Sequence, residues 1–219
     1  MSAADPLRRV LQTGIVAIIR APSGELLADV AEALLAGGID VMEVTFTIPG
    51  AIRVLEQVSS RLGDRVLLGA GTVLDTETAR AAILSGAEFI VSPSTNIEVI
   101  EVCKRYSKLS MPGAFTPTEV IAAWQAGADI VKIFPSDVHG PKYLKALRGP
   151  YPQVRMMPTG GVTLETAADF LKAGACALGV GGSLVEARAL ADRDLARIET
   201  LSRRFVEAVG QARESHHAP

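Results

Sequence analysis

The sequence predicts the α/β class and, within it, a single-domain (β/α)8 barrel (TIM barrel), with an open doubly wound sheet as the alternative. Eight short β-rich runs alternate with segments of helical spacing along the chain. Several of these runs are apolar on both faces, which is typical of parallel strands covered on each side by other elements. The length of 219 residues also suits one barrel, since such domains routinely run to about 200 to 250 residues.

The expected strands are runs of apolar and β-branched residues. In chain order they span residues 15–20, 41–46, 66–70, 88–92, 109–112, 129–134, 155–159 and 176–180. The first and the sixth contain IVAII and DIVKIF, which are nearly continuous apolar runs. Such runs favour strands that are buried on both sides, as the strands of a barrel are.

The helical segments between the strands are identified by their apolar spacing and by the glycine that often ends them. They span residues 26–38, 51–63, 76–87, 97–106, 117–128, 141–147 and 164–175. Glycine favours the position after a helix because it adopts positive φ without a steric penalty. The last segment, 188–209, is expected to be an amphipathic helix packed on the outside. We assign residues 1–213 to the barrel domain and 214–219 to a disordered tail.

Charge and cysteine content argue against several classes of partner. The 22 basic and 24 acidic residues give a net charge of −2, so the chain lacks the basic field that nucleic acid requires. No apolar run approaches the about 20 residues that cross a bilayer, and no signal peptide is evident. Cys103 and Cys176 form no disulfide scaffold and fit a reducing cytoplasm. The three histidines form no metal-binding motif, so neither a metal nor another cofactor is expected.

Lys132 is the first candidate for chemistry, because it stands near the end of an otherwise apolar strand, where such barrels carry their active sites. A lysine is almost never fully buried unless it is paired. Burial lowers the pKa of a lysine. If the pKa fell from about 10.4 to about 7, half of the amine would be neutral, and therefore nucleophilic, at pH 7. Lys132 is therefore a candidate Schiff-base lysine, and a structural ion pair is the alternative.

Glu43 is the natural partner of Lys132, since it is another ionisable residue within a β-branched strand. It shares one face of the strand with Val41 and Thr45, but the sequence leaves open which face points inward. If both residues point into the mouth of the barrel, the carboxylate could move protons to and from a substrate. A carboxylate that only neutralises the lysine is the alternative.

Two glycine clusters follow the last two strands, in the segments PTGGV at 158–162 and GVGGS at 179–183. Loops after strands seven and eight are the recurrent phosphate site of these barrels. Free backbone N–H groups and the absence of side chains let a phosphate approach the chain. The pair of clusters therefore predicts a phosphate site, with simple turns as the alternative.

Six motifs occur in order between about residues 15 and 183: VMEVTFTIP, LGAGTVL, FIVSP, MPGAFTPTE, VKIFP and PTGGV. Together they resemble the 2-keto-3-deoxy-6-phosphogluconate (KDPG) aldolases, a family that includes 4-hydroxy-2-oxoglutarate (KHG) and 6-phosphogalactonate relatives. The resemblance implies a metal-free class I aldolase of carbohydrate metabolism on a (β/α)8 barrel, assembled as a homotrimer.

By the same resemblance, Lys132 forms an imine with the 2-oxo group of the substrate, and Glu43 takes the proton of the 4-hydroxyl through water. Cleavage of the C3–C4 bond then gives pyruvate and an aldehyde, which is D-glyceraldehyde 3-phosphate for KDPG. The resemblance also implies the substrate contacts: Thr72 and Pro93 at the pyruvate end, Phe134 beside the imine, and Gly160, Gly161, Gly182 and Ser183 at the phosphate.

One departure from the family pattern concerns the substrate carboxylate. Many relatives have an arginine where this chain has Thr47, and threonine offers no bidentate charged contact. Arg20, which matches an arginine at the end of the first strand in some members, is the candidate substitute. The departure leaves the preferred substrate open among KDPG, 2-keto-3-deoxy-6-phosphogalactonate and KHG.

Two other functions are compatible with the barrel. A phosphosugar isomerase or epimerase would use Glu43 and the glycine loops without a Schiff base. A non-catalytic barrel would serve as an assembly or binding module, since fold alone does not fix function. The joint presence of Lys132, Glu43, Thr72 and both glycine loops favours an enzyme.

Overall fold

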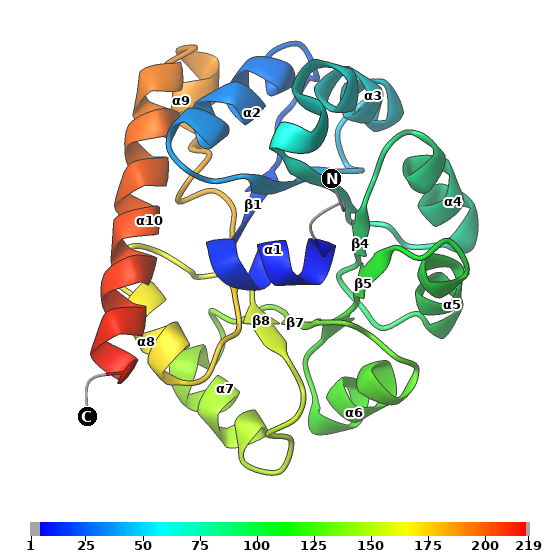
Figure 1. Ribbon diagram of the computed structural model, residues 1–219, viewed down its shortest axis with the longest axis vertical. Helices are drawn as coiled ribbons and strands as arrows, with labels where there is room; N and C mark the ends of the chain where they lie inside the picture. The colour runs from blue at the N-terminus through cyan, green and yellow to red at the C-terminus, as the bar shows by residue number, and fades with distance from the viewer. Residues whose placement is uncertain (1–4, 218–219) are drawn as a thin grey trace.

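Parallel strands form a closed ring at the centre of the protein, in a computed structural model that describes residues 5–217 (Figure 1). One sheet has the order β5-β4-β3-β2-β1-β9 and a second has the order β6-β7-β8. The strands are β1 (Ile15–Ile19), β2 (Val41–Thr45), β3 (Leu67–Gly71), β4 (Phe89–Val91), β5 (Leu109–Met111), β6 (Gly113–Ala114), β7 (Val131–Ile133), β8 (Met156–Pro158) and β9 (Leu178–Val180).

The two sheets join at both ends. β5 and β6 are consecutive pieces of one strand, separated by Pro112, which has no N–H to donate. A parallel bridge between Thr159 and Gly179 links the end of β8 to β9. The predicted (β/α)8 barrel is therefore confirmed, with the fifth expected strand divided in two.

Helices surround the ring, and each expected helical segment between the strands contains one. They are α1 (Pro6–Thr13), α2 (Leu27–Ala36), α3 (Ala51–Leu62), α4 (Thr76–Leu84), α5 (Ile97–Arg105), α6 (Pro117–Gln125), α7 (Gly140–Arg148), α8 (Ala167–Lys172), α9 (Ala187–Ala191) and α10 (Leu195–His217). Side-chain caps fix several starts, and at α6 Thr116 and Glu119 form a capping box. In the described residues no helix is long and apolar enough to cross a membrane.

The C-terminal end of the chain differs from the expected pattern. We expected a disordered tail over 214–219, but α10 continues through the first of these residues to His217. The sequence does not predict this extension because the apolar residues at helical spacing end near Val209 and Ala212, while the backbone continues as a helix. Residues 218–219 lie outside the described part of the chain.

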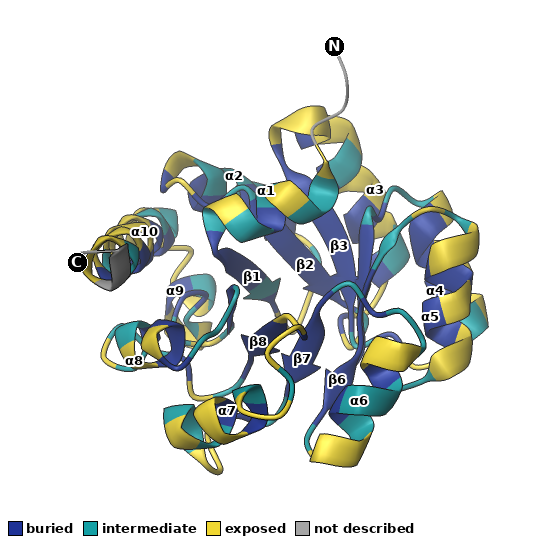
Figure 2. Cartoon of the chain, turned by 60° about the horizontal axis from the view of Figure 1, so that its bottom comes forward, coloured by how far each residue is buried: buried dark blue, intermediate teal, exposed yellow. Residues whose placement is uncertain are grey.

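Buried apolar side chains form two clusters, and Figure 2 shows that the strands and the inner faces of the helices are buried. The larger cluster lies between the ring and the helices around it. The smaller cluster includes Val16, Val41, Phe89 and Ile130, from strands on different sides of the ring. These residues therefore point into the barrel, and they fill its interior on the side where the strands begin.

Helix α1, which the sequence did not predict, lies across the centre of the ring in Figure 1. Its Val10 is fully buried and belongs to the interior cluster. Arg9 Nε pairs with Asp40 Oδ2 at 2.7 Å, and Arg9 also donates to the carbonyl oxygen of Asp64 at 3.0 Å. The helix closes the N-terminal end of the barrel, which leaves the opposite end for a site.

Helix α10 packs tightly on α2. A Cβ atom at Gly37 would lie 2.3 Å from Ser202 Cβ and 2.6 Å from Glu199 O, so only glycine allows this approach. Ser202 is fully buried, and its hydroxyl donates to Ile198 O at 2.8 Å. The start of α10 is therefore held in a fixed position against the barrel.

Candidate active site

A cavity of about 810 Å³ opens at the C-terminal end of the strands. It brings together six of the residues that the sequence predicted for the site: Arg20, Phe134, Gly160, Gly161, Gly182 and Ser183. Thr47 and Thr159 line the same cavity. Lys132, Glu43, Thr72 and Pro93 are not among its lining residues.

Lys132 and Glu43 both point into the barrel. Val41 and Ile130 belong to the interior cluster, and the twofold alternation of a strand places Glu43 on the face of Val41 and Lys132 on the face of Ile130. Both side chains are buried, with residue exposures of 6% for Lys132 and 1% for Glu43. The question that the sequence left open, which face is inward, is thereby answered.

Burial moves the pKa values of both groups toward their neutral forms. Loss of hydration raises the pKa of Glu43, and the charges of Lys132 and Arg20 offset part of that rise. Loss of hydration lowers the pKa of Lys132; the Glu43 carboxylate raises it, and Arg20 lowers it further. The amine is thus more nucleophilic, and the carboxyl more able to hold a proton, than either group would be in water.

Small residues make room for the carboxyl of Glu43. A Cβ atom at Gly71 would lie 2.2 Å from Glu43 Oε1, so the glycine in β3 is needed for Glu43 to take its place. Glu43 Oε2 is buried and has no hydrogen-bond partner among the described residues. An unsatisfied buried carboxyl oxygen is costly, and this one is available to a water molecule or a substrate.

Phe134 and Pro93 lie around Lys132. The Lys132 ammonium nitrogen is 4.9 Å from the centroid of the Phe134 ring, within the range of a cation–π contact. Gly113 pairs with Lys132 in the ladder, and a Cβ atom at Gly113 would lie 2.3 Å from the carbonyl of Pro93. Pro93 therefore packs beside the strand that neighbours the lysine.

Thr72 follows Gly71 at the end of β3, next to the residue that makes room for Glu43. Its φ is 59°, a left-handed conformation that is uncommon for a threonine. Strained backbone of this kind gathers at binding sites, which gives Thr72 a structural signal in addition to its motif.

The two glycine loops meet at the mouth of the cavity. Ser183 Oγ donates to Val162 O at 2.6 Å and so links the loop after β9 to the loop after β8. Within residues 5–217, the backbone N–H groups of Gly161, Gly182 and Ser183 donate no hydrogen bond. These groups can receive an anion, to which Ser183 would then contribute its N–H, while its hydroxyl proton is engaged by Val162 O.

Thr159 and Thr47 are two of the cavity residues to which sequence reasoning gave no role in binding. Thr159 Oγ1 is buried without a hydrogen-bond partner among the described residues, and Gly179 leaves just enough space for it. The sequence placed Thr159 at a strand end, but an unpartnered hydroxyl has no sequence pattern. Thr47 Oγ1 lies 3.2 Å from Thr45 Oγ1, so the threonine that replaces an arginine is part of a hydroxyl pair.

The arrangement combines an amine of lowered pKa, a buried carboxyl and a pair of anion-binding loops. It can form an imine with a carbonyl compound, move a proton near the reacting carbon, and bind an anionic group at the other end of the molecule. Among the side chains that the structure describes, no group of three or more His, Cys, Asp or Glu could hold a metal ion.

A family model and the similar proteins that we compared point to the same family of aldolases. Residues 8–201 match the model of a family described as KDPG and KHG aldolase. The chain is 36% identical to the 2-dehydro-3-deoxy-phosphogluconate aldolase of Treponema pallidum over 208 residues, 94% of this chain and 97% of that protein. It is 34% identical to the 2-dehydro-3-deoxy-6-phosphogalactonate aldolase of Escherichia coli, over 89% of this chain and 96% of that protein.

A solved structure extends the comparison to three dimensions. The KDPG aldolase of Legionella pneumophila, captured with pyruvate as a covalent carbinolamine, superposes with a TM-score of 0.86 at 29% identity. The superposition covers 92% of this chain and 98% of that one.

The pH dependence of Lys132 reactivity tests the electrostatics of the site. The amine reacts with cyanate only when neutral, so its carbamylation rate should rise with pH around a midpoint below that of an ordinary lysine. Glu43→Gln removes the charge that raises the Lys132 pKa, so the midpoint should move to lower pH. Peptide mass analysis across a pH series gives the rates, with exposed Lys142 in the same digest as the reagent control. An unchanged or higher midpoint in the variant would contradict the coupling.

Proposed function

Because the chain belongs to the KDPG and KHG aldolase family, we propose that it is a class I aldolase that cleaves KDPG or a close 4-hydroxy-2-oxo acid. The products are pyruvate and an aldehyde, which is D-glyceraldehyde 3-phosphate when the substrate is KDPG. The observation that carries the proposal is Lys132, a buried lysine of lowered pKa on the inner face of the barrel beside buried Glu43. The 6-phosphogalactonate and KHG activities of the same family are the alternatives for the substrate.

The reaction begins when the neutral Lys132 amine attacks C2 of the substrate. Loss of water gives an imine, whose protonated form accepts the electron pair of the C3–C4 bond. As that bond breaks, the proton of the 4-hydroxyl passes through a water molecule to Glu43, and the aldehyde forms. The remaining enamine takes a proton at C3, and water then hydrolyses the imine to release pyruvate and restore the amine.

The environment of Glu43 suits this proton transfer. The raised pKa of Glu43 lies closer to neutral pH than that of an ordinary glutamate, and a group whose pKa is near the pH can both accept and return a proton. The unpartnered Oε2 offers a position for the water that carries the proton. Thr159 also lines the cavity, and its buried Oγ1 is the other side-chain oxygen without a hydrogen-bond partner among the described residues.

The two ends of the substrate need separate anion contacts. We assign the phosphate to the loops of Gly160, Gly161, Gly182 and Ser183, and the pyruvate end to Thr72, Pro93 and Phe134. Arg20 is exposed at the end of β1 and lines the same cavity as the glycine loops. Because Thr47 carries no charge, Arg20 is our candidate for the substrate carboxylate.

Borohydride reduction in the presence of pyruvate tests the mechanism. A reduced imine should add the mass of a pyruvyl group to the peptide that contains Lys132, since reduction converts the reversible imine to a stable amine. Lys132→Met should lose both the adduct and the aldolase activity, while Lys142→Met keeps both. A folded wild-type protein without an adduct would contradict the Schiff base, and isomerase activity retained in Lys132→Met would favour a phosphosugar isomerase or epimerase.

Kinetics of Arg20→Ala test the carboxylate contact. Loss of a charge-assisted contact typically costs about 1.5 to 3 kcal/mol, so the KM should rise at least about tenfold. The phosphorylated and unphosphorylated forms of one 2-keto-3-deoxy sugar acid should be affected equally if Arg20 binds the carboxylate. Arg105→Ala, at the end of α5 and away from the cavity, is the control. An unchanged KM would remove Arg20 from the site, and a rise for the phosphorylated form alone would assign it to the phosphate.

We also propose that the chain forms a homotrimer, as the family resemblance implies. Leu74 and Ile97 are large apolar residues that are 57% and 50% exposed near the C-terminal end of the strands. Asn96 Nδ2 donates to Leu74 O at 3.2 Å, so the two segments lie side by side. Neighbouring exposed apolar side chains are typical of an interface.

The proposal further includes a single barrel domain over residues 1–213 and a cytoplasmic location. Two free thiols, of buried Cys103 and half-buried Cys176, support a reducing compartment.

The molar mass in solution tests the trimer and its surface. Light scattering of the wild type should give three times the mass of one chain. Leu74→Glu places a charge in the proposed interface and should reduce the mass to that of one chain, because a buried unpaired charge is costly. Leu84→Glu, at a residue of α4 that is 63% exposed, should leave the mass unchanged. A wild type with the mass of one chain would contradict the trimer.

A further inference from the structure

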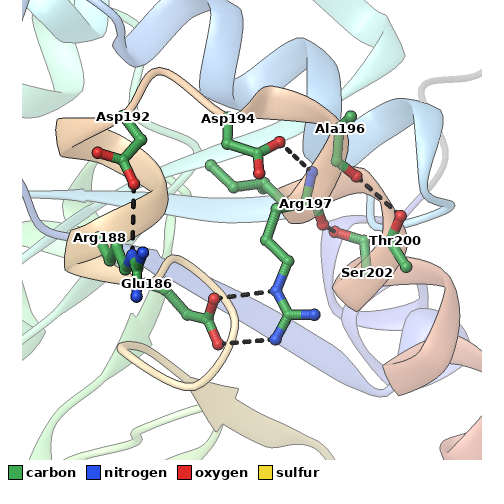
Figure 3. Close-up of polar contacts among 9 residues, drawn as sticks. Glu186, Arg188, Asp192, Asp194, Ala196, Arg197, Thr200 and Ser202 are labelled. Carbon is green, nitrogen blue, oxygen red and sulfur yellow. Dashed lines mark hydrogen bonds and ion pairs between the residues drawn. The ribbon is translucent and has the colours of Figure 1, made fainter.

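The loop after β9 forms one wall of the cavity, and two polar contacts hold it in addition to the buried side chains of Leu184 and Val185. Ser183, Val185 and Ala187 all line the cavity. The first contact is the hydrogen bond from Ser183 Oγ to Val162 O. The second is that of Glu186, which Figure 3 shows facing Arg197 of α10. Arg197 Nε donates to Glu186 Oε2 at 3.0 Å, and Arg197 Nη2 donates to Glu186 Oε1 at 3.1 Å.

The arginine end of this contact is fixed to the barrel. Arg197 N donates to Asp194 Oδ1 at 2.9 Å, so Asp194 caps the start of α10. Ile198, the next residue, is fully buried, and Gly37 allows α10 to sit directly on α2. The guanidinium therefore projects from a rigid element, and its two parallel hydrogen bonds fix the carboxylate in direction as well as in distance.

The glutamate end of the contact lies in the loop that forms the cavity wall, although Glu186 itself does not line the cavity. Glu186 lies between Val185 and Ala187, and it is the residue that precedes α9. Hydrogen bonds from Arg197 lower the pKa of Glu186, so it carries its charge at neutral pH. A shift of Glu186 would carry with it the residues on either side, and with them the turn that begins at Gly181.

That turn presents the N–H groups of Gly182 and Ser183. Leu184 N and Val185 N each donate to Gly181 O at 2.9 Å, which makes the segment one helical turn. A Cβ atom at Gly182 would meet nothing within 4 Å, so neighbouring side chains do not hold the turn at that residue. Its position depends on the buried side chains of Leu184 and Val185 and on the polar contacts at either side of them, those of Ser183 and Glu186.

We infer that Arg197 is a positioning residue for the phosphate end of the site: its bidentate contact with Glu186 holds the loop whose N–H groups receive the phosphate. The inference rests on the proposed function, since it assumes a phosphorylated substrate. Arg197 lies outside the cavity lining and touches no reacting atom, so it acts only through Glu186.

Two other ion pairs nearby provide matched controls. Arg188 of α9 pairs at 3.4 Å with Asp192, the residue that follows this helix, and Figure 3 shows this pair beside the Glu186 contact. Arg203 pairs with Glu199 within α10. Both pairs link residues four apart in the chain and hold no cavity loop, so their loss should leave substrate binding unchanged.

The experiment compares KM and kcat for the phosphorylated and unphosphorylated forms of one 2-keto-3-deoxy sugar acid. In Arg197→Met the KM of the phosphorylated form should rise about fivefold, the effect of a partly exposed ion pair at the upper end of its range. Its kcat and the KM of the unphosphorylated form should change less than about twofold, because the imine chemistry lies elsewhere. Arg197→Lys keeps the positive charge but cannot form two parallel hydrogen bonds with Glu186, so its KM should be intermediate. The inhibition constant of inorganic phosphate should rise with the KM.

Other outcomes separate the possible errors. An unchanged KM for the phosphorylated form in Arg197→Met would overturn the inference, and so would an equal rise for both substrates, which indicates a general loss of structure. Arg188→Ala and Arg203→Ala should match the wild type; a rise in either equal to that of Arg197→Met would also overturn it. If Arg197→Met does not fold, Arg197→Lys and Glu186→Gln carry the same comparison. A wild type without aldolase activity would instead contradict the proposed function.

Discussion

The structure depends on the burial of a lysine and a glutamate inside an apolar ring. Burial disfavours the charged forms of both Lys132 and Glu43, and the charge of each residue partly stabilises the charged form of the other. A core that only had to be stable would place apolar side chains there, since a buried ionic pair often contributes less than well-packed hydrophobic residues. The cost is offset by the rest of the ring, whose interior on the side of Val16, Val41, Phe89 and Ile130 is fully apolar. Stability and chemistry therefore occupy opposite ends of the same barrel.

The division between the two ends also governs the loops. At the N-terminal end, α1 and Arg9 cover the ring and satisfy backbone carbonyls. At the C-terminal end, by contrast, N–H groups and two side-chain oxygens, Glu43 Oε2 and Thr159 Oγ1, are left without partners among the described residues. Unsatisfied polar groups are rare in folded proteins, so their concentration at one end indicates where ligands bind. The ion pair between Glu186 and Arg197 then supports the open end from outside, without adding a charge to the cavity wall.

Much of this architecture was predictable because strands and helices have different apolar periodicities. All eight strand regions and the helices between them follow from that signal, and Lys132 stood out because it interrupts an apolar strand. The inward direction of Lys132 and Glu43 was not predictable, since residues on both faces of their strands are apolar. Helix α1 was missed because only Val10 of it is fully buried, and Thr159 because an unpartnered hydroxyl depends on neighbours distant in sequence. The contact between Glu186, which precedes α9, and Arg197 of α10 joins residues eleven apart, a separation that follows from no helical or strand periodicity.

Closure of the ring has a consequence for how the chain reaches its native state. β9 pairs with β1, so the first strand of the barrel to be synthesised remains without this partner until the last strand of the barrel is made. Arg213 adds a second link between the chain ends, because it donates to the carbonyl oxygens of Leu11 and Gln12 in α1. Contacts so distant in sequence carry a high loop-closure entropy and slow folding. Until they form, β1 and β8 present open edges of the kind that pair with other chains. During synthesis the barrel therefore remains exposed to misassociation until β9 and α10 emerge.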